Sequence, residues 1–359
     1  ETWTKRSDED GLPKGELGRI GLAISRSKPN VVYALIEAKD NALYRSDDGG
    51  TKWRKMADKN MGDRPFYYSE IYVDPKDENR VYSIHTVITR SEDGGRNFDT
   101  WAGWTIHPDH HAFWISPDDS EFIINGNDGG LNITRDGGKS WRFIENLPVG
   151  QFYHVNVDNA IPYNIYGGLQ DNGSWVGPSN VWRSGGVRNQ DWKEVLFGDG
   201  FDVMPVKNNN RYGYAMSQGG ELNLFDLKTG VTENLKPVHP EGKELRYNWN
   251  SALAQNPFHD NGIYYCSQYV HKSLDRGKTW EIISPDLSTN DSIKTKKESG
   301  GLTPDITGAE NHCTILAIAP SPVDENVIWV GTDDGNVQLT TDGGKSWKNT
   351  ASGIGIFTT

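Results

Sequence analysis

The chain has 359 residues, of which 35% are hydrophobic, and its formal net charge is −12, with 49 acidic residues against 37 basic ones. This acid excess, without a dense Lys/Arg run, excludes nucleic acid as an expected partner, and the sequence has no stretch of about 18 apolar residues that would span a membrane. The many Gly (40), Trp (13) and Tyr (15) residues favour short strands and tight turns over leucine-striped helices.

An eight-residue motif, Ser/Thr-x-Asp-x-Gly-x-Ser/Thr-Trp, recurs along the chain at 46–53, 91–98, 134–141, 273–280 and 340–347, with small departures in the first two copies. Its central aspartates are Asp48, Asp93, Asp136, Asp275 and Asp342. The first three are 45 and 43 residues apart, and the next interval of 139 residues leaves room for two degenerate copies, which we place at 169–175 and 225–230. A period of this length is typical of propeller blades.

Each repeat contains an apolar strand, a Pro/Asp turn, a second strand, a Gly-rich turn, a third strand, the motif and a fourth strand. Counted in this way, seven units begin near residues 17, 66, 110, 150, 200, 250 and 313. The sequence therefore predicts an all-β fold, a seven-bladed β-propeller of four-stranded antiparallel blades, with residues 1–359 in one propeller and no long helix.

The repeated aspartates have a structural interpretation. A carboxylate beside Gly in a turn accepts backbone N–H groups, the Gly supplies a positive φ, and the Trp packs between adjacent sheets. We therefore expect the motif, known as the Asp box, to fix the hairpin between strands three and four rather than to form a row of calcium or catalytic sites.

Two features depart from the period. The 67 residues between Asp275 and Asp342 leave an insertion of about 23 residues between Trp280 and His312, and 291–304 is expected to form a long exposed loop, on the ligand side. Residues 1–4 match the end of an Asp box and its fourth strand. We therefore expect a piece of a longer protein with further domains, in which residues 2–5 pair with a strand from outside this chain.

Several segments carry a resemblance to known proteins: 167–175, 198–202, 246–250 and 284–287. With the Asp boxes, they resemble the sortilin-like, or BNR (Asp-box) repeat, propeller family of large bacterial proteins, often labelled glycosyl hydrolases. The resemblance implies tandem propellers in an extracellular, cell-surface or periplasmic protein. It does not imply a substrate.

A more distant similarity is to the xyloglucanases of glycoside hydrolase family 74. Their first blade has an aspartate after a Val-Tyr-Ala strand, and Glu37 follows the matching strand here. The similarity thus implies a catalytic role for Glu37, although a surface turn residue is the alternative. Such enzymes place the second carboxylate on a second propeller, which this chain lacks. Sialidases are excluded because 18–21, Gly-Arg-Ile-Gly, lacks the Pro of their motif.

Polar residues gather in the connections that a propeller places on the face opposite the Asp boxes, and this face is the candidate ligand site. They are His107, Asp109, His110, His111, Asp128, His154, Gln170, Asp171, Asp199, Gln218, Asn248, Asn250, Gln268, His271, Glu310, Asn311 and His312. The structural alternative is a polar, water-filled channel between inner strands.

No metal and no cofactor is predicted. His110 and His111 are adjacent on an expected strand, where neighbouring side chains point to opposite faces, so they are not expected to share an ion. Cys266 and Cys313 are expected on strand two of blade six and strand one of blade seven, as buried free thiols, although a disulfide between neighbouring inner strands is geometrically conceivable.

Two functions follow from these observations. The first is a binding or scaffold propeller that recognises a peptide or an oligosaccharide through the polar face. The second is a glycoside hydrolase, acting on a plant or microbial polysaccharide, whose site is shared with a missing second propeller. A carboxylate pair with one raised pKa would favour the enzyme, and a mouth lined by amides and aromatics without such a pair would favour binding.

Overall fold

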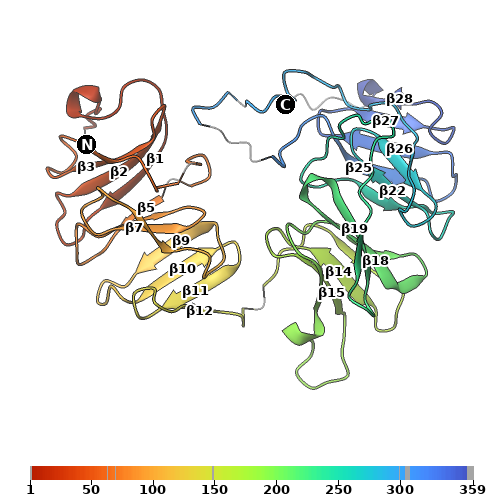
Figure 1. Ribbon diagram of the computed structural model, residues 1–359, viewed down its shortest axis with the longest axis horizontal. Helices are drawn as coiled ribbons and strands as arrows, with labels where there is room; N and C mark the ends of the chain where they lie inside the picture. Colours follow the sequence, from red (N-terminus) through yellow and green to blue (C-terminus); the bar gives the residue numbers. More distant parts are fainter. Residues whose placement is uncertain are drawn as a thin grey trace. The chain divides into compact units, whose positions relative to one another are not determined.

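The computed structural model describes residues 2–62, 64–68, 70–147, 149–298, 300–303 and 308–353. It contains two compact units: an N-terminal unit of Glu1–Pro148 with Glu298–Asp305, and a C-terminal unit of Val149–Lys297 with Ile306–Thr359. Figure 1 shows their sheets following one another in chain order, red to yellow in the first unit and green to blue in the second. Each unit is described separately below.

The N-terminal unit holds three four-stranded sheets. Blade one consists of β1 (Leu17–Ile24), β2 (Val32–Ala38), β3 (Ala42–Ser46) and β4 (Arg54–Ala57); blade two of β5 (Glu70–Val73), β6 (Val81–Ile84), β7 (Ile88–Ser91) and β8 (Asp99–Ala102); and blade three of β9 (His110–Ile115), β10 (Ile123–Asn127), β11 (Gly130–Thr134) and β12 (Arg142–Phe143).

The C-terminal unit holds four further four-stranded sheets. Blade four consists of β13 (Val155–Val157), β14 (Asn164–Gly168), β15 (Ser174–Pro178) and β16 (Lys193–Leu196); blade five of β17 (Val203–Val206), β18 (Asn209–Ser217), β19 (Glu221–Asp226) and β20 (Thr232–Asn234); blade six of β21 (Leu253–Gln255), β22 (Ile263–Cys266), β23 (Val270–Ser273) and β24 (Glu281–Ile282); and blade seven of β25 (Ile315–Pro320), β26 (Ile328–Thr332), β27 (Val337–Thr340) and β28 (Lys348–Asn349).

Every sheet is an antiparallel meander in which strands pair in chain order. The helical structure in the described residues is limited to 3-10 turns of three residues. The predicted fold class is therefore confirmed: the protein is all-β, with the seven four-stranded antiparallel sheets of a seven-bladed β-propeller. The first strand of each blade begins within five residues of the start expected from the repeats.

The hydrophobic core lies between neighbouring sheets rather than within one of them. In the N-terminal unit, Tyr33 and Leu43 of blade one pack in one cluster with Ile71 and Val81 of blade two. In the C-terminal unit, Tyr166 of blade four packs with residues of blade five in the same way. Fully burying one large apolar side chain stabilises a fold by about 1.5–3 kcal/mol, so each sheet depends on its neighbour.

Five hairpins between the third and fourth strands share one hydrogen-bond pattern. In the copy of blade six, the Ser273 hydroxyl donates to Oδ1 of Asp275 (2.8 Å) and accepts from the Gly277 N–H (2.8 Å), while Oδ1 also accepts from the Thr279 N–H (2.9 Å). Gly277 has a φ of 88°, which favours glycine. The other four copies make the same three bonds at 2.7–3.0 Å.

Three of the tryptophans that end these hairpins contact the preceding blade, whereas Nε1 of Trp53 donates to the Gly50 carbonyl of its own hairpin. Nε1 of Trp280 donates to the Leu235 carbonyl (2.9 Å), and Nε1 of Trp347 donates to the Ile283 carbonyl (3.0 Å). Trp141 packs edge-on against Trp101 of blade two, with ring centroids 5.6 Å apart. The Asp-box hairpin therefore fixes a turn and also joins two sheets.

One of the two degenerate copies is wrongly placed by the sequence. Residues 169–175 connect β14 to β15, the second and third strands of blade four, so this segment is no Asp-box hairpin. The third and fourth strands of that blade are joined by the longer connection 179–192. By contrast, 225–230 does lie between β19 and β20, where Oδ1 of Asp226 accepts the Lys228 N–H at 2.9 Å.

The predicted N-terminal strand is also wrong for the described residues. Residues 2–7 form no strand, and Trp3 is 96% exposed. Instead, the Ser7 side chain caps a 3-10 turn, Asp8–Asp10, by accepting the Glu9 N–H. An edge strand without a partner has no ladder bonds to hold it extended, which accounts for the difference.

The insertion and the cysteines lie close to their expected positions. No strand is present among the described residues between β24 and β25, and residues 292–298 are exposed, so the exposed loop is confirmed for 292–298, whereas Thr303 near its end is buried. Cys266 ends β22 as expected, whereas Cys313 precedes β25 in the left-handed region (φ 63°). Both are buried free thiols, as predicted.

Candidate functional site

An antiparallel meander divides the connections of each sheet between its two ends. The first and third hairpins, which include the Asp boxes, share one end. The turn between strands two and three and the connection to the next blade share the other, which we call the rim end. The predicted ligand residues all lie in or beside rim-end connections, including Gln170 and Asp171, whose segment the repeat pattern predicts as a degenerate Asp box.

In the C-terminal unit, three successive blades bring polar side chains together at the rim end. His154 precedes β13, Asp202 immediately precedes β17, and Asn250 lies in the connection that leads to β21. Nε2 of His154 is 2.7 Å from Nδ2 of Asn250. Oδ1 of Asp202 accepts a hydrogen bond from Nδ2 of Asn156 at 2.6 Å. His154 and Asn156 are two residues apart, so they share one face of the extended backbone.

Asp202 is the carboxyl group in this cluster whose protonation is perturbed. Burial raises the pKa of Asp202, while the nearby His154 and the hydrogen bond from Asn156 oppose that rise. A buried carboxyl with a raised pKa retains its proton more readily than an exposed one. The cluster thus combines a carboxyl with a raised pKa, an imidazole and amides.

A second set of contacts joins the rim ends of blades four and five. The Tyr153 hydroxyl donates to Oε1 of Gln170 (2.5 Å), and the Asp171 N–H donates to Oδ1 of Asp199 (2.8 Å). The Asp199 N–H in turn donates to Oε1 of Gln218 (3.2 Å). These contacts order the loops that flank His154.

A third set fixes the connection into blade six. Nδ2 of Asn248 donates to the Asn311 carbonyl (2.9 Å) and to Oδ2 of Asp333 (3.0 Å), and Nδ1 of His312 lies 3.9 Å from the same carboxylate oxygen. Glu310 accepts the Gly308 N–H through Oε2 (3.1 Å). Asn248, Asn311 and Glu310 are therefore engaged within the fold, and their polar atoms support the shape of the rim.

Two predicted ligand residues of this unit lie inside the protein. Gln268 is buried, with Oε1 accepting the Arg246 N–H (2.8 Å) and Nε2 donating to the Glu244 carbonyl (3.0 Å). His271 lies in β23, is buried, and contacts the Ser267 hydroxyl at 2.9 Å. Burial lowers the pKa of His271 to about 4. Both side chains are therefore buried groups that stabilise the rim-end loops, and neither is exposed to a ligand.

In the N-terminal unit, the side chains of His110 and His111 point to opposite sides of their strand, as expected for neighbouring residues of an extended backbone. His110 is buried, its Nδ1 lies 3.0 Å from Oδ1 of Asn125, and burial lowers its pKa to about 4. His111 points outward, with Nε2 3.0 Å from Oδ1 of Asp128. Nδ1 of His107 is 3.1 Å from the Pro108 carbonyl. The two adjacent histidines do not face one site.

Asp109 and Asp128 are the acidic pair of this rim end. Carboxylate oxygens of the two lie within 4.8 Å of each other. In the described part of this unit, no third His, Cys, Asp or Glu joins them at that spacing. These two carboxylates alone are not enough for us to assign a metal site.

Glu37, the candidate catalytic residue, is buried, and both of its carboxylate oxygens accept hydrogen bonds within the protein. Its Oε2 accepts the Arg19 N–H (2.9 Å), its Oε1 accepts the Thr303 hydroxyl (2.7 Å), and 9% of the residue is exposed. A side chain at Gly18 would clash with this carboxylate, since a Cβ there would lie 2.2 Å from Oε2. The contacts explain Glu37 as a structural group within the N-terminal unit.

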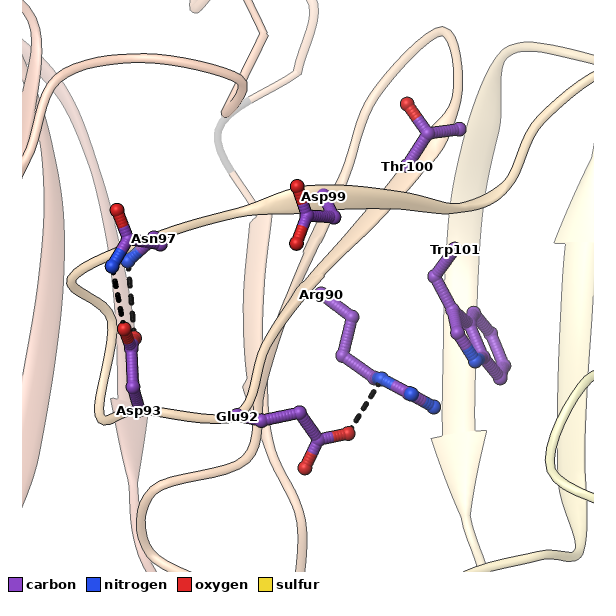
Figure 2. Close-up of a pocket in the computed structure, with 7 residues that line it drawn as sticks. All are labelled: Arg90, Glu92, Asp93, Asn97, Asp99, Thr100 and Trp101. Carbon is purple, nitrogen blue, oxygen red and sulfur yellow. Dashed lines mark hydrogen bonds and ion pairs between the residues drawn. The ribbon is translucent and has the colours of Figure 1, made fainter.

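A shallow hollow of about 240 Å³ lies at the Asp-box end of blade two, lined by Arg90, Glu92, Asp93, Asn97, Asp99, Thr100 and Trp101. Figure 2 shows Arg90 extending between Glu92 and Trp101, and Asn97 facing Asp93. Nε of Arg90 contacts Glu92 at 2.8 Å, and Asp93 is bound within its own hairpin. The hollow is therefore part of the turn architecture.

Sequence reasoning missed several rim residues. Asp202 is the last residue of 198–202, a segment that stands out in the sequence only for its resemblance to known proteins, yet it occupies the same place in blade five as His154 does in blade four, just before the first strand. Superimposing the repeats would have found it. Phe66 and Tyr67, which lie between β4 and β5, are exposed although aromatic residues usually indicate a core.

Comparison with known proteins gives a distant similarity. No protein-family model matches the chain. It is 24% identical to the xyloglucanase Xgh74A of Acetivibrio thermocellus over 73% of this chain and 38% of that protein, and 25% identical to the same-named protein of a second strain, with the same coverage. The chain thus spans 38% of the length of these curated relatives.

Among solved structures, the chain is similar to the GH74 xyloglucanase from Xanthomonas campestris, with 16% identity and a TM-score of 0.35, covering 90% of this chain and 52% of that one. It is also similar to the GH74 enzyme of Niastella koreensis, with 11% identity and a TM-score of 0.29, covering 92% and 65%. YCF48 bound to D1 peptide has 14% identity and a TM-score of 0.31, covering 89% and 92%. In the described residues, no helix is long and apolar enough to cross a membrane.

Proposed function

We propose that the protein is a glycan-binding β-propeller module that takes its ligand at the rim end of the C-terminal unit. The observation that carries this proposal is the convergence of His154, Asp202 and Asn250 from three successive blades. Amides, an imidazole and a carboxyl group can donate to and accept from hydroxyl groups, and a concave set of such groups is typical of a small-ligand site.

Of the two ligand classes that the sequence left open, similarity to a xyloglucanase favours a glycan over a peptide. An extracellular or cell-surface location is part of the same proposal, because polysaccharides of this kind lie outside the cell. The sortilin-like relationship remains a proposal that rests on the motifs alone.

Binding of xyloglucan and of other soluble glycans, measured by isothermal titration calorimetry, tests the proposal. We expect His154→Ala and Asn250→Ala each to weaken binding about tenfold, the effect of losing about 1.4 kcal/mol. His259→Ala is the matched control: His259 is an exposed histidine that contacts Glu325 at 2.9 Å, between β21 and β22, away from the rim end. Binding of peptides alone, or equal effects of His154→Ala and His259→Ala, would contradict the proposal.

A second candidate function, glycoside hydrolysis, is favoured by one observation: the raised pKa of Asp202 suits a general acid. An inverting or retaining mechanism needs a second carboxylate at a defined distance from the first. Release of reducing ends from xyloglucan by the wild type, lost in Asp202→Asn with binding retained, would support the enzyme. Glycan binding without any hydrolysis would support the binding module and contradict the enzyme.

A further inference from the structure

The connection between blades one and two exposes two aromatic side chains next to each other. Phe66 is 59% exposed and Tyr67 is 37% exposed, in the segment that joins β4 to β5 at the rim end of the N-terminal unit. The adjacent Tyr68 is buried. Exposed aromatic pairs of this kind mark binding surfaces more often than scattered apolar residues do.

The two rings form a corner. Their centroids are 5.2 Å apart and their planes meet at 79°. The guanidinium of Arg64 covers one face of Tyr67, with its carbon 4.1 Å from the ring centroid. The pair therefore offers one ring face with an adjoining aromatic wall, which suits a compact ring better than an extended chain.

The corner is held in place by its backbone. Nη1 of Arg19 donates to the Phe66 carbonyl (3.2 Å) and to the Tyr67 carbonyl (2.8 Å), and Nη2 pairs with Oε1 of Glu70 (3.3 Å). The Tyr67 N–H also donates to the Arg64 carbonyl at 3.0 Å. A loop ordered before binding loses less conformational entropy when a ligand arrives.

Basic groups lie against the corner itself, because Arg64 covers Tyr67 and Arg19 binds both carbonyls, whereas the acidic groups Asp109 and Asp128 lie near the buried Tyr68. The Tyr68 ring lies 5.4 Å from the His111 ring, which in turn contacts Asp128. Burial, followed by the hydrogen bond to Asp109, raises the pKa of Tyr68, so its phenol stays neutral.

We propose that Phe66 and Tyr67 form a stacking platform for a pyranose ring of an uncharged glycan, a second binding position separate from the His154 cluster. The axial C–H groups of a pyranose carry a partial positive charge and pack on the negative face of an aromatic ring. This inference rests on the proposed function in one respect, namely that the ligand is an uncharged glycan of the xyloglucan kind.

The experiment measures binding of xyloglucan, which is uncharged, and of polygalacturonate, which is anionic, to the full chain by affinity electrophoresis and calorimetry. The variants are Phe66→Ala, Tyr67→Ala and Phe66→Trp, with Phe258→Ala as the control. Phe258 is 44% exposed and lies between β21 and β22, away from the rim end. Circular dichroism and thermal unfolding establish that each variant is folded.

We expect Phe66→Ala and Tyr67→Ala each to weaken xyloglucan binding at least fivefold, Phe66→Trp to retain it, and Phe258→Ala to leave it unchanged. Xyloglucan binding that survives both alanine variants would overturn the platform while leaving the proposed function intact. Equal binding of polygalacturonate would overturn the preference for an uncharged ligand. A wild-type chain that binds no glycan would overturn the proposed function and the platform together.

Discussion

Replacing Ser273 by alanine isolates the hydroxyl that heads one Asp-box hairpin. Ser273 ends β23 and is 2% exposed. Its hydroxyl donates to Asp275 and accepts from the buried Gly277 N–H, each at 2.8 Å. Alanine keeps the backbone and the Cβ but removes both contacts, so any loss of stability reports on the hydroxyl.

The expected loss comes from the two groups left behind. A buried donor without a partner costs about 1–3 kcal/mol, and this applies directly to the Gly277 N–H. The Asp275 carboxylate still accepts the Thr279 N–H at 2.9 Å and is exposed, so water replaces its lost bond. We therefore expect Ser273→Ala to lower the free energy of unfolding by about 2 kcal/mol, mostly through the orphaned amide.

Ser273→Thr is the matched control because threonine occupies the equivalent positions Thr134 and Thr340. Their hydroxyls make the same two bonds at 2.8 and 2.9 Å. Both threonines are also buried, so the hairpin has room for the extra methyl group. Urea unfolding followed by tryptophan fluorescence measures all three proteins, and Trp280 reports on the hairpin itself. A Ser273→Ala variant within about 0.5 kcal/mol of wild type, or a threonine variant as unstable as the alanine one, would refute the reasoning.

Four further predictions concern buried titratable groups. Because burial depresses the pKa of His110 and of His271 to about 4, both are neutral in the fold, whereas the unfolded chain takes up protons from about pH 6.5 downward. Urea midpoints should therefore fall between pH 7 and pH 5, and His271→Gln should flatten that slope; an unchanged slope would contradict the buried neutral state. Asp202 has a raised pKa in the fold, so its charge destabilises the protein above that pKa, and Asp202→Asn should raise the urea midpoint at pH 7 but not near pH 4. Glu37→Gln loses one of two acceptor contacts and should cost about 1 kcal/mol while leaving glycan binding unchanged; an abolished activity at unchanged stability would restore its catalytic role. Burial raises the pKa of the Cys266 thiol, so a thiol reagent should label it only in urea, and rapid labelling of the native protein would count against the buried position.

The fold was predictable because the signals that define it are local. A Ser/Thr, an Asp and a Gly at fixed spacing form hydrogen bonds within one hairpin. The repeat therefore predicts where the third strand of each blade ends. The error at 169–175 shows the limit of that logic. The segment has the Asp, Gly and Trp of the motif, but it connects β14 to β15, so the decisive information is which strands it joins. Strand pairing depends on residues far from the turn.

The site was predictable in position but not in exposure. Topology places Gln268 and His271 near the rim end, yet the packing of neighbouring loops buries both. Conversely, Phe66 and Tyr67 have the composition of a core segment and are exposed, because Arg19 holds their carbonyls. Neither outcome follows from residue type or spacing alone, since each is decided by contacts between separate blades.

The two ends of the blades use their polar groups differently, and this difference favours the rim end as the proposed binding surface. At the Asp-box end, the hydroxyls, carboxylates and turn amides of each hairpin bond to one another; for example, the Ser346 side chain holds the pKa of Asp342 down at about 2. At the rim end of the C-terminal unit, His154 and Asn250 contact each other from separate blades and are accessible. Groups that complete a turn cannot leave it without exposing unpaired amides. A contact between two side chains can instead be exchanged for a contact with a hydroxyl-bearing ligand at little net cost, which supports the proposal that the ligand binds at the rim end.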